Sequence, residues 1–266
     1  MTRGEPIPLW PAGAPGADSA DPRFEPTITP FALDGPPRAA IVVCPGGGYS
    51  HRAPHEADPI ALMLNEQGLA GFVCAYRVAP YRHPWPLTDA QRAIRFVRHH
   101  ARALNVDPGR VGILGFSAGG HLAATAATHY DSGDPAAADP IDRQGCRPNA
   151  AVLCYPVISF HAFGHLGSQQ NLLGPEPDQA LRASLSNDRQ VTADTPPTFL
   201  WHTAEDPGVP VENSLMFAAA LSAAKVPFAL HVYPHGRHGL GLATEENYVG
   251  TWPDLLGNWL AELGWR

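Results

Sequence analysis

Short runs of apolar residues alternate with helical segments along most of this chain, and this alternation limits the fold more than any other feature. The apolar runs have the length of buried strands and lie at 27–33, 39–44, 72–76, 111–114, 151–154, 198–201 and 228–232. Helical spacing predicts helices between them, at 57–67, 119–128, 213–224 and 252–263. Short apolar strands that alternate with helices predict an α/β fold, with a mostly parallel sheet and helices on both faces. Ligand sites in such sheets lie beyond the carboxyl ends of the strands.

One further helix is predicted to begin at Asp89, as its N-cap, and to run to about Leu104. Its apolar side holds Ala93, Ile94 and Val97, and its polar side holds Arg92, Arg95 and Arg98. His99 and His100 follow on the polar side without an acidic or cysteine partner at ligand spacing. We therefore expect these histidines to be solvated rather than bound to a metal.

The length of 266 residues predicts a single domain at 1–266. Six prolines within the first 26 residues exclude a regular helix there and predict an extended arm at 1–26. Two long segments, 130–148 and 159–197, interrupt the alternation of strands and helices. We expect these excursions to form the rim of the site or a small cap over it.

Charge and cysteine usage exclude several classes of protein. The net charge is −7, and the 18 Lys and Arg residues are scattered, so nucleic acid is not an expected partner. No apolar run is long enough to span a membrane, and the first residues lack the apolar core of a signal peptide. Three of the four cysteines lie in predicted strands and Cys146 lies in a loop, so we expect no disulfide. Together these features predict a cytoplasmic protein.

A G-x-S-x-G motif lies between a predicted strand and a predicted helix. The sequence Gly115-Phe116-Ser117-Ala118-Gly119-Gly120 follows the apolar run at 111–114 and precedes an alanine-rich stretch. This context is typical of a nucleophile elbow, in which glycines allow neighbouring backbones to approach closely and the serine is held exposed on a strained turn. Ser117 is therefore the predicted nucleophile.

A catalytic serine needs a base and an acid that orients the base. The strand at 198–201 leads to Glu205 and Asp206, and we prefer Asp206 because the prolines that follow restrict its turn, with Glu205 as the fallback. The strand at 228–232 leads to His235 and His238, and we prefer His238 because the adjacent glycines give its ring room. The order serine, aspartate, histidine is that of the α/β-hydrolases.

Donors for an oxyanion are predicted in the loop after the strand at 39–44. This loop reads Pro45-Gly46-Gly47-Gly48-Tyr49, and its glycines allow backbone N–H groups to face a carbonyl oxygen. We assign Gly47 and Gly48, together with the N–H of Ala118. Glu56, a little further on, is interpreted as a hydrogen-bonded loop anchor and less readily as a substrate contact. Four aromatic residues could form a sugar or aryl platform but more often simply pack: Trp85, Trp201, Phe160 and Phe163.

Motifs along nearly the whole chain resemble those of a known group, the α/β-hydrolase esterases of the acetylxylan esterase and feruloyl-esterase-like (BD-FAE) type. They are LWPAGAPG (9–16), PGGGY (45–49), YRVAP (76–80), DAQRA (89–93), GFSAGGHL (115–122) and DPGVP (206–210), with His238-Gly239. The resemblance implies the α/β-hydrolase fold with an eight-stranded sheet. It also implies a serine carboxylesterase that removes short acyl groups, mainly acetyl, from carbohydrates such as xylo-oligosaccharides without metal or cofactor. The neighbouring lipases have His where this chain has Pro45, which favours the sugar-esterase type.

Other functions stay open beside this one. They are a feruloyl or general short-chain carboxylesterase, a peptidase of the prolyl oligopeptidase type, and an inactive hydrolase that only binds. The peptidase is disfavoured because no propeller precedes the hydrolase core, and the binding protein because it would not require all three catalytic groups. The expected partner is an acylated sugar or short-chain ester, with neither nucleic acid nor membrane, and self-association into a homo-oligomer is compatible with the sequence.

Overall fold

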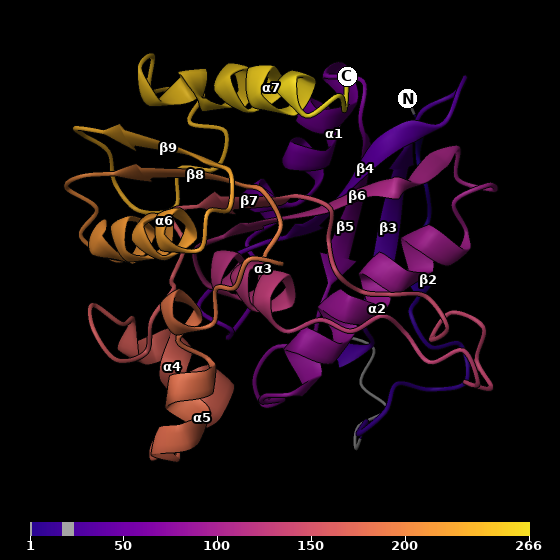
Figure 1. Cartoon of the computed structure of the whole chain (residues 1–266), viewed down its shortest axis with the longest axis horizontal. Helices are drawn as coiled ribbons and strands as arrows, with labels where there is room; N and C mark the ends of the chain where they lie inside the picture. Colours follow the sequence, from indigo (N-terminus) through magenta and orange to yellow (C-terminus); the bar gives the residue numbers. More distant parts are fainter. Residues whose placement is uncertain (1, 18–23) are drawn as a thin grey trace.

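One sheet forms the centre of the computed structural model, which describes residues 2–17 and 24–266 (Figure 1). Its nine strands occupy eight positions, because β1 (Thr2–Arg3) and β2 (Ile7–Pro8) pair with different parts of β3 (Thr27–Ala32). The other strands are β4 (Arg38–Cys44), β5 (Ala70–Ala75), β6 (Val106–Phe116), β7 (Ala151–Cys154), β8 (Thr198–Thr203) and β9 (Phe228–Tyr233). Only the pairs that involve β3 are antiparallel, so the predicted eight-stranded, mostly parallel sheet is confirmed.

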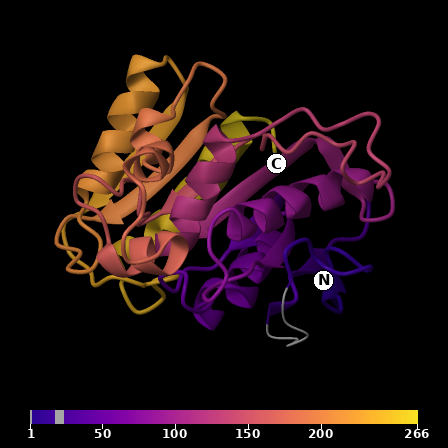
Figure 2. The same cartoon turned by 90° about the horizontal axis from the view of Figure 1, so that it is seen from below.

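The strand order is β1-β3-β5-β4-β6-β7-β8-β9, with β4 and β6 near the middle. In the central strands Val43 lies opposite Val73 on one side and Leu114 on the other, and all three are buried. Seen from below, the chain passes from the indigo N-terminal edge to the orange strands and helix at the far edge (Figure 2). Because the strands from β5 to β9 in this order are parallel, their carboxyl ends all lie at the same end of the sheet, where functional loops are expected.

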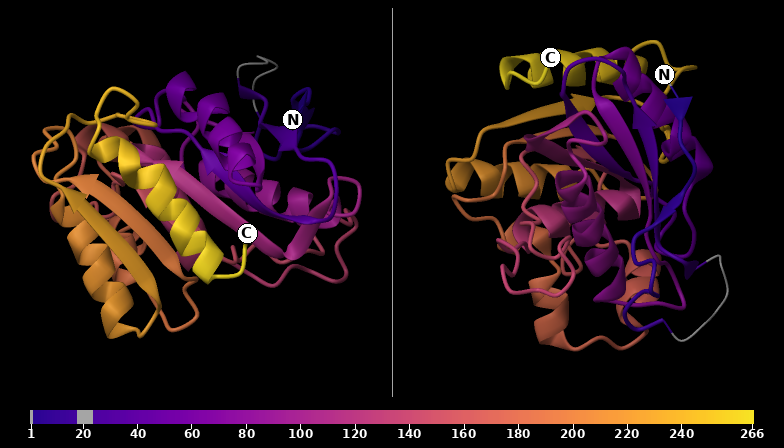
Figure 3. Two further views of the ribbon diagram at one scale, coloured as in Figure 1. Left: turned by 90° about the horizontal axis from the view of Figure 1, so that it is seen from above. Right: turned by 90° about the vertical axis from the view of Figure 1, so that its right-hand side faces the viewer.

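Helices cover both faces of the sheet, as predicted. On one face lie α1 (Asp58–Glu66) and α7 (Trp252–Glu262), which Figure 3 shows crossing above the strands. The other face carries α2 (Trp85–His99), α3 (Ser117–Thr128) and α6 (Glu212–Ala223). Because side chains alternate along a strand, Ile41 and Val43 pack towards the α1 side and Val42 towards the α2 side. Each layer therefore has its own buried core.

The start of α2 differs from the prediction. The helix begins at Trp85, with Pro86 in its first turn, where a missing N–H costs no helical hydrogen bond. Asp89 is not the N-cap: it lies inside the helix, fully buried, and its carboxylate accepts hydrogen bonds from the Arg77 guanidinium at 2.7 Å and from the Arg77 N–H at 2.8 Å. Arg92 is also buried, and not on a solvated face, because it pairs with Asp142 at 2.7 Å. The positions of Asp89 and Arg92 are both decided by ion pairs with residues distant in the sequence, which local sequence patterns do not reveal.

The two excursions behave differently. The second contains α4 (Leu166–Leu173), α5 (Gln179–Ser184) and the short 3-10 helix η3 (Asn187–Arg189), which lie together beyond α3 in Figure 1. The first, 130–148, follows the far end of α3, and its carbonyl groups at Gly145 and Arg147 accept hydrogen bonds from Arg98 of α2. The expectation that 130–148 rims the site is wrong, because α3 has returned the chain to the amino ends of the strands.

The described part of the predicted arm does more than extend over the surface. It contributes β1 and β2 to the edge of the sheet, and Leu9 is fully buried. Residues 1 and 18–23 of the predicted arm lie outside the described part of the chain. The described residues also form the 3-10 helices η2 (Pro54–Glu56) and η4 (Val249–Thr251). Within residues 2–17 and 24–266, no helix is long and apolar enough to cross a bilayer.

Candidate active site

The serine of the G-x-S-x-G motif stands at a sharp turn between β6 and α3. Ser117 is the first residue of α3, and its φ of +52° lies in the left-handed region that non-glycine residues rarely adopt. The turn is tightly packed: a Cβ on Gly119 would lie 2.1 Å from the Cys44 carbonyl oxygen, and one on Gly115 would lie 2.0 Å from the Gly119 carbonyl oxygen. The two glycines are therefore required by close backbone approach.

Three side chains from separate loops form a hydrogen-bonded chain. The Nε2 atom of His238 lies 2.8 Å from the Ser117 hydroxyl oxygen, and its Nδ1 atom lies 2.7 Å from Asp206 Oδ2. A carboxylate can only accept, so Nδ1 carries the proton and Nε2 is left to accept from the serine. The other oxygen of Asp206 accepts from the N–H groups of Gly208 at 2.8 Å and Val209 at 2.9 Å. The arrangement holds the imidazole in the tautomer that a general base requires.

The electrostatics keep Asp206 ionised. Burial raises the pKa of its carboxyl, but hydrogen bonds from His202 and His238 and from the Val209 N–H lower this pKa by a larger amount. The net pKa is therefore well below the ordinary value. His202 is itself fully buried and held by the Ser214 hydroxyl at 2.8 Å. The negative charge needed to stabilise an imidazolium is therefore present at neutral pH.

The competing acid and base lie elsewhere. Glu205 and His235 follow the same strands, but both are exposed and pair with each other, with 3.0 Å between Nδ1 and Oε2. Glu205 also accepts from the Gly236 N–H at 3.2 Å. Of the candidates at these two strand ends, the structure brings Asp206 and His238 to Ser117 and leaves Glu205 and His235 as a surface pair.

The glycine loop and the serine line the same cleft. Gly47 and Gly48 have φ values of +124° and +63°, and a Cβ on Gly47 would lie 2.3 Å from the His51 carbonyl oxygen. Within the described residues, neither of their N–H groups donates a hydrogen bond. A cleft of about 210 Å³ opens here, and its lining comprises Gly47, Gly48, Ala53, His55, Glu56, Ser117, His165, His238 and Gly239. The N–H of Ala118, in the first turn of α3, has no partner within the helix and is the third predicted donor.

Glu56 connects three loops beneath this cleft. Its side chain is buried, and its two carboxylate oxygens accept from the Gly46 N–H at 2.7 Å and the Tyr155 hydroxyl at 2.6 Å. The Tyr155 oxygen in turn accepts from the Gly241 N–H at 2.8 Å, and its ring packs edge-on against His238. Burial and the neighbouring Glu56 raise the pKa of Tyr155 well above its ordinary value, so it stays a donor. These contacts agree with the predicted role of Glu56 as a loop anchor.

A second tie joins the glycine loop to α3. The Tyr49 hydroxyl lies 2.8 Å from Nδ1 of His121, and Nε2 of His121 lies 2.8 Å from the Leu185 carbonyl oxygen. A carbonyl oxygen only accepts, so the neutral ring carries its proton on Nε2 and accepts from Tyr49. Burial lowers the pKa of His121 to about 4, which keeps the ring neutral near pH 7. The loop that carries the predicted oxyanion donors is thus fixed from both ends.

Some residues near the site escaped sequence reasoning. Tyr155 follows the predicted strand at 151–154 directly. Asp206 and His238 were chosen because they follow predicted strands, and the same criterion would have identified Tyr155. His165 lies in the second excursion, whose folding no local pattern reveals. Among the aromatic candidates, Trp201 and Phe160 are buried and Trp85 packs against Arg77, whereas Phe163 is 50% exposed.

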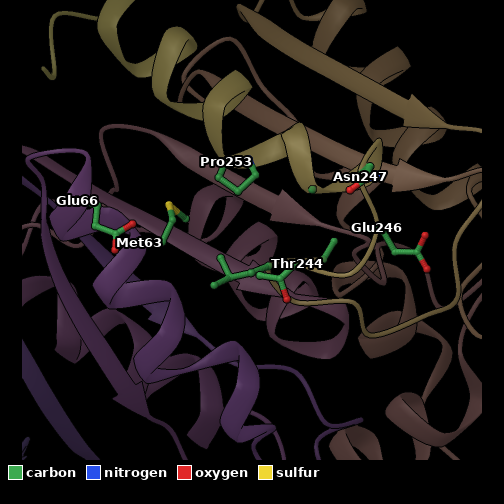
Figure 4. Close-up of a pocket in the computed structure, with 9 residues that line it drawn as sticks. Met63, Glu66, Thr244, Glu246, Asn247 and Pro253 are labelled. Carbon is green, nitrogen blue, oxygen red and sulfur yellow. The ribbon is translucent and has the colours of Figure 1, made fainter.

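A larger hollow of about 350 Å³ lies apart from this chemistry. It is formed by α1 and by the segment that leads into α7 (Figure 4). Its lining includes Met63, Glu66, Thr244, Asn247 and Pro253, and neither Ser117 nor His238. The smaller cleft, which contains the hydrogen-bonded serine, is therefore the candidate active site.

A serine at a strand-to-helix elbow, with histidine and aspartate from later loops at the same edge of a mostly parallel sheet, defines the α/β-hydrolase class. Residues 30–221 match the model of the BD-FAE family. The chain belongs to this family of α/β-hydrolase esterases, as its motifs predicted.

Solved structures of related proteins share the whole fold. The crystal structure of the acetyl ester-xyloside bifunctional hydrolase from Caldicellulosiruptor lactoaceticus is 53% identical, with a TM-score of 0.97 over 99% of this chain and 97% of that one. The carboxylesterase Cest-2923 from Lactobacillus plantarum is 28% identical, with a TM-score of 0.78 over 99% of this chain and 98% of that one.

Curated relatives are longer proteins. An acetylxylan esterase from Xylanibacter ruminicola is 36% identical over 239 residues, which cover 88% of this chain and 47% of the relative. The endo-1,4-beta-xylanase B of Butyrivibrio fibrisolvens is 39% identical over 217 residues, which cover 80% of this chain and 34% of the relative. The chain thus spans between a third and a half of the length of these two relatives.

Proposed function

We propose that this protein is a serine carboxylesterase that hydrolyses short acyl esters, mainly acetyl esters, of carbohydrates such as xylo-oligosaccharides. The observation that carries the proposal is the hydrogen-bonded chain from Ser117 through His238 to Asp206, with distances of 2.8 and 2.7 Å. Nucleophile, base and orienting acid are then within reach of one another before substrate arrives.

The reaction has two steps. Nε2 of His238 takes the Ser117 proton while Oγ attacks the ester carbon, and the N–H groups of Gly47, Gly48 and Ala118 hold the resulting oxyanion. The imidazolium, stabilised by Asp206, then returns its proton to the leaving alcohol, and the bond between the acyl carbon and the alcohol oxygen breaks. Water, deprotonated by the same imidazole, attacks the acyl-enzyme, releases the carboxylic acid and restores Ser117.

The substrate class rests on the relatives and on the size of the cleft. Two similar proteins, an acetylxylan esterase and an acetyl ester-xyloside hydrolase, are named for acetyl esters of xylose-based carbohydrates. The cleft of about 210 Å³ has room for a short acyl group such as acetyl beside Ser117. The four cysteines within the described residues are free and buried, which supports the further proposal that the enzyme works in the cytoplasm.

The test is a matched series of esters with wild type and Ser117→Ala. The series contains p-nitrophenyl acetate, butyrate and octanoate, an acetylated xylo-oligosaccharide and methyl ferulate. We expect release of acetate from the sugar ester to have the highest kcat/KM, and Ser117→Ala to lower kcat by about 10⁴-fold or more with an unchanged melting temperature. Preference for ferulate or octanoate would refute the substrate class, and an active Ser117→Ala would refute the mechanism.

A further inference from the structure

His165 is held at the edge of the cleft by the start of α4. It is the N-cap residue of this helix, and its Nδ1 atom accepts a hydrogen bond from the Ser168 N–H at 3.1 Å. The Ser168 hydroxyl oxygen also lies 2.8 Å from Nδ1. Capping of this kind restricts the ring to one orientation, because the acceptor must face the first turn of the helix.

The capping bond determines which ring nitrogen carries the proton. A backbone N–H can only donate, so Nδ1 of His165 is the acceptor and the neutral ring carries its proton on Nε2. Within the described residues, no group accepts a hydrogen bond from this Nε2 atom. The ring is half-buried and lines the cleft together with Ser117 and His238. A donor without a protein partner is thus present in the candidate active site.

The segment that carries His165 is anchored to the rest of the site. Asn171, in the same helix, donates from Nδ2 to the Gly48 carbonyl oxygen at 2.8 Å, which ties α4 to the glycine loop. On the other side, Asn213 of α6 donates to the Phe163 carbonyl oxygen at 2.9 Å. His165 therefore has a fixed place relative to the predicted oxyanion donors, as a recognition residue requires.

The surroundings indicate which part of an ester would meet this donor. Burial lowers the pKa of His165, and the nearby His238 lowers it further, so the ring is neutral near pH 7. His165 lines the same cleft as Ser117 and His238. In acyl transfer the predicted oxyanion donors hold the carbonyl oxygen of the acyl group, and an acetyl group has no other acceptor. The acceptor left for the Nε2–H group of His165 is therefore an oxygen of the alcohol part.

We propose that His165 donates a hydrogen bond from Nε2 to an oxygen of the sugar in the alcohol part of the substrate, and so selects sugar esters over esters of simple alcohols. This role rests on the proposed carbohydrate esterase function. Sugars present hydroxyl and ring oxygens close to the ester bond, whereas a simple alkyl alcohol presents none. A site built to donate to such an oxygen loses that bond with an alkyl ester.

Two conservative variants separate recognition from capping. His165→Asn places an amide oxygen near the position of Nδ1 and has no atom that reaches the position of Nε2, so it keeps the cap and removes the donor at that position. His165→Gln places an amide N–H near the position of Nε2, so it keeps a donor and removes the cap. His161→Ala is the matched control, because His161 is an exposed histidine of the same segment that does not line the cleft.

The measured quantity is the kcat/KM for an acetylated xylo-oligosaccharide divided by the kcat/KM for ethyl acetate. We expect His165→Asn to lower this ratio by about three- to tenfold, the effect of one neutral hydrogen bond, with most of the change in KM for the sugar ester. His165→Gln should retain more of the ratio than His165→Asn and have the lower melting temperature. His161→Ala should match wild type in both measurements.

Two results overturn the proposal in distinguishable ways. If wild type cleaves the sugar ester and His165→Asn keeps its ratio, or if only His165→Gln loses it, His165 is merely a helix cap and the esterase function stands. If wild type cleaves ethyl acetate but not the sugar ester, the proposed substrate class fails and the role of His165 fails with it.

Discussion

Replacement of Glu56 by glutamine tests whether a buried carboxylate holds the active-site loops together. Both carboxylate oxygens accept hydrogen bonds, one from the Gly46 N–H and one from the Tyr155 hydroxyl. Tyr155 in turn accepts from Gly241, so a single side chain connects the glycine loop, the end of β7 and the loop after His238. Glutamine has almost the same shape but offers only one accepting oxygen.

The size of the effect follows from this difference. If the amide nitrogen of the introduced glutamine faces Gly46, two N–H donors oppose each other at the position where 2.7 Å now separates donor and acceptor. If it faces Tyr155, the phenolic hydrogen loses its acceptor. Either way one buried donor is left unsatisfied, which costs about 1–3 kcal/mol of unfolding free energy. The activity should fall as well, because Gly46 precedes the predicted oxyanion donors and Tyr155 packs against His238.

Urea unfolding and the kcat for p-nitrophenyl acetate measure the two consequences. Glu66→Gln is the control, because Glu66 is an exposed glutamate of α1 for which the structure shows no hydrogen bond or ion pair from its side chain to the described residues. We expect Glu56→Gln to lose about 1–3 kcal/mol and Glu66→Gln to stay within about 0.5 kcal/mol of wild type. Equal stability and equal kcat in the two variants would refute the proposed anchoring role.

Two further predictions concern charge. Asp206→Asn should lower kcat by about 10³–10⁴-fold, because an amide no longer selects the required imidazole tautomer, whereas Glu205→Gln should leave the rate of ester hydrolysis near that of wild type; the reverse order would identify Glu205 as the acid. The pKa of His121 is about 4 in the folded protein and near 6.5 in the unfolded chain, so the unfolded state binds more protons in between and stability falls as pH falls. Lowering the pH from 7.5 to 4.5 should therefore lower the free energy of unfolding by about 2–3 kcal/mol through this group. Urea unfolding of wild type and His121→Gln at both pH values measures this loss. If the two proteins show the same pH dependence, other groups cause it.

The strand-to-helix elbow illustrates what can be read locally. Glycines at Gly115 and Gly119 are needed because neighbouring backbones lie within contact distance of the turn, and this requirement is visible in the motif itself. The order of strands and loops likewise follows from apolar periodicity, so the loops that carry Asp206 and His238 could be predicted to meet Ser117. In each case the signal is contained in a short stretch of sequence.

Asp89 illustrates what local patterns miss. An aspartate before an apolar stretch is typical of an N-cap, yet here the carboxylate is buried against Arg77, with 2.7 Å between guanidinium nitrogen and carboxylate oxygen. The guanidinium also lies 4.9 Å from the Trp85 ring centroid, so the helix starts earlier to form this cluster. The partner comes from another element of the chain, and no propensity of the segment itself reveals it.

The sequence by itself thus determined the main strands and helices around the sheet, their order and the loops that carry the predicted nucleophile, base and acid, because strand and helix periodicity and turn chemistry act over a few residues. Only the tertiary structure decided that Glu56 and Tyr155 connect three loops, that 130–148 lies away from the cleft and that His165 reaches it. These features depend on where segments distant in the sequence pack, and the free energy of such contacts resides in neither segment alone.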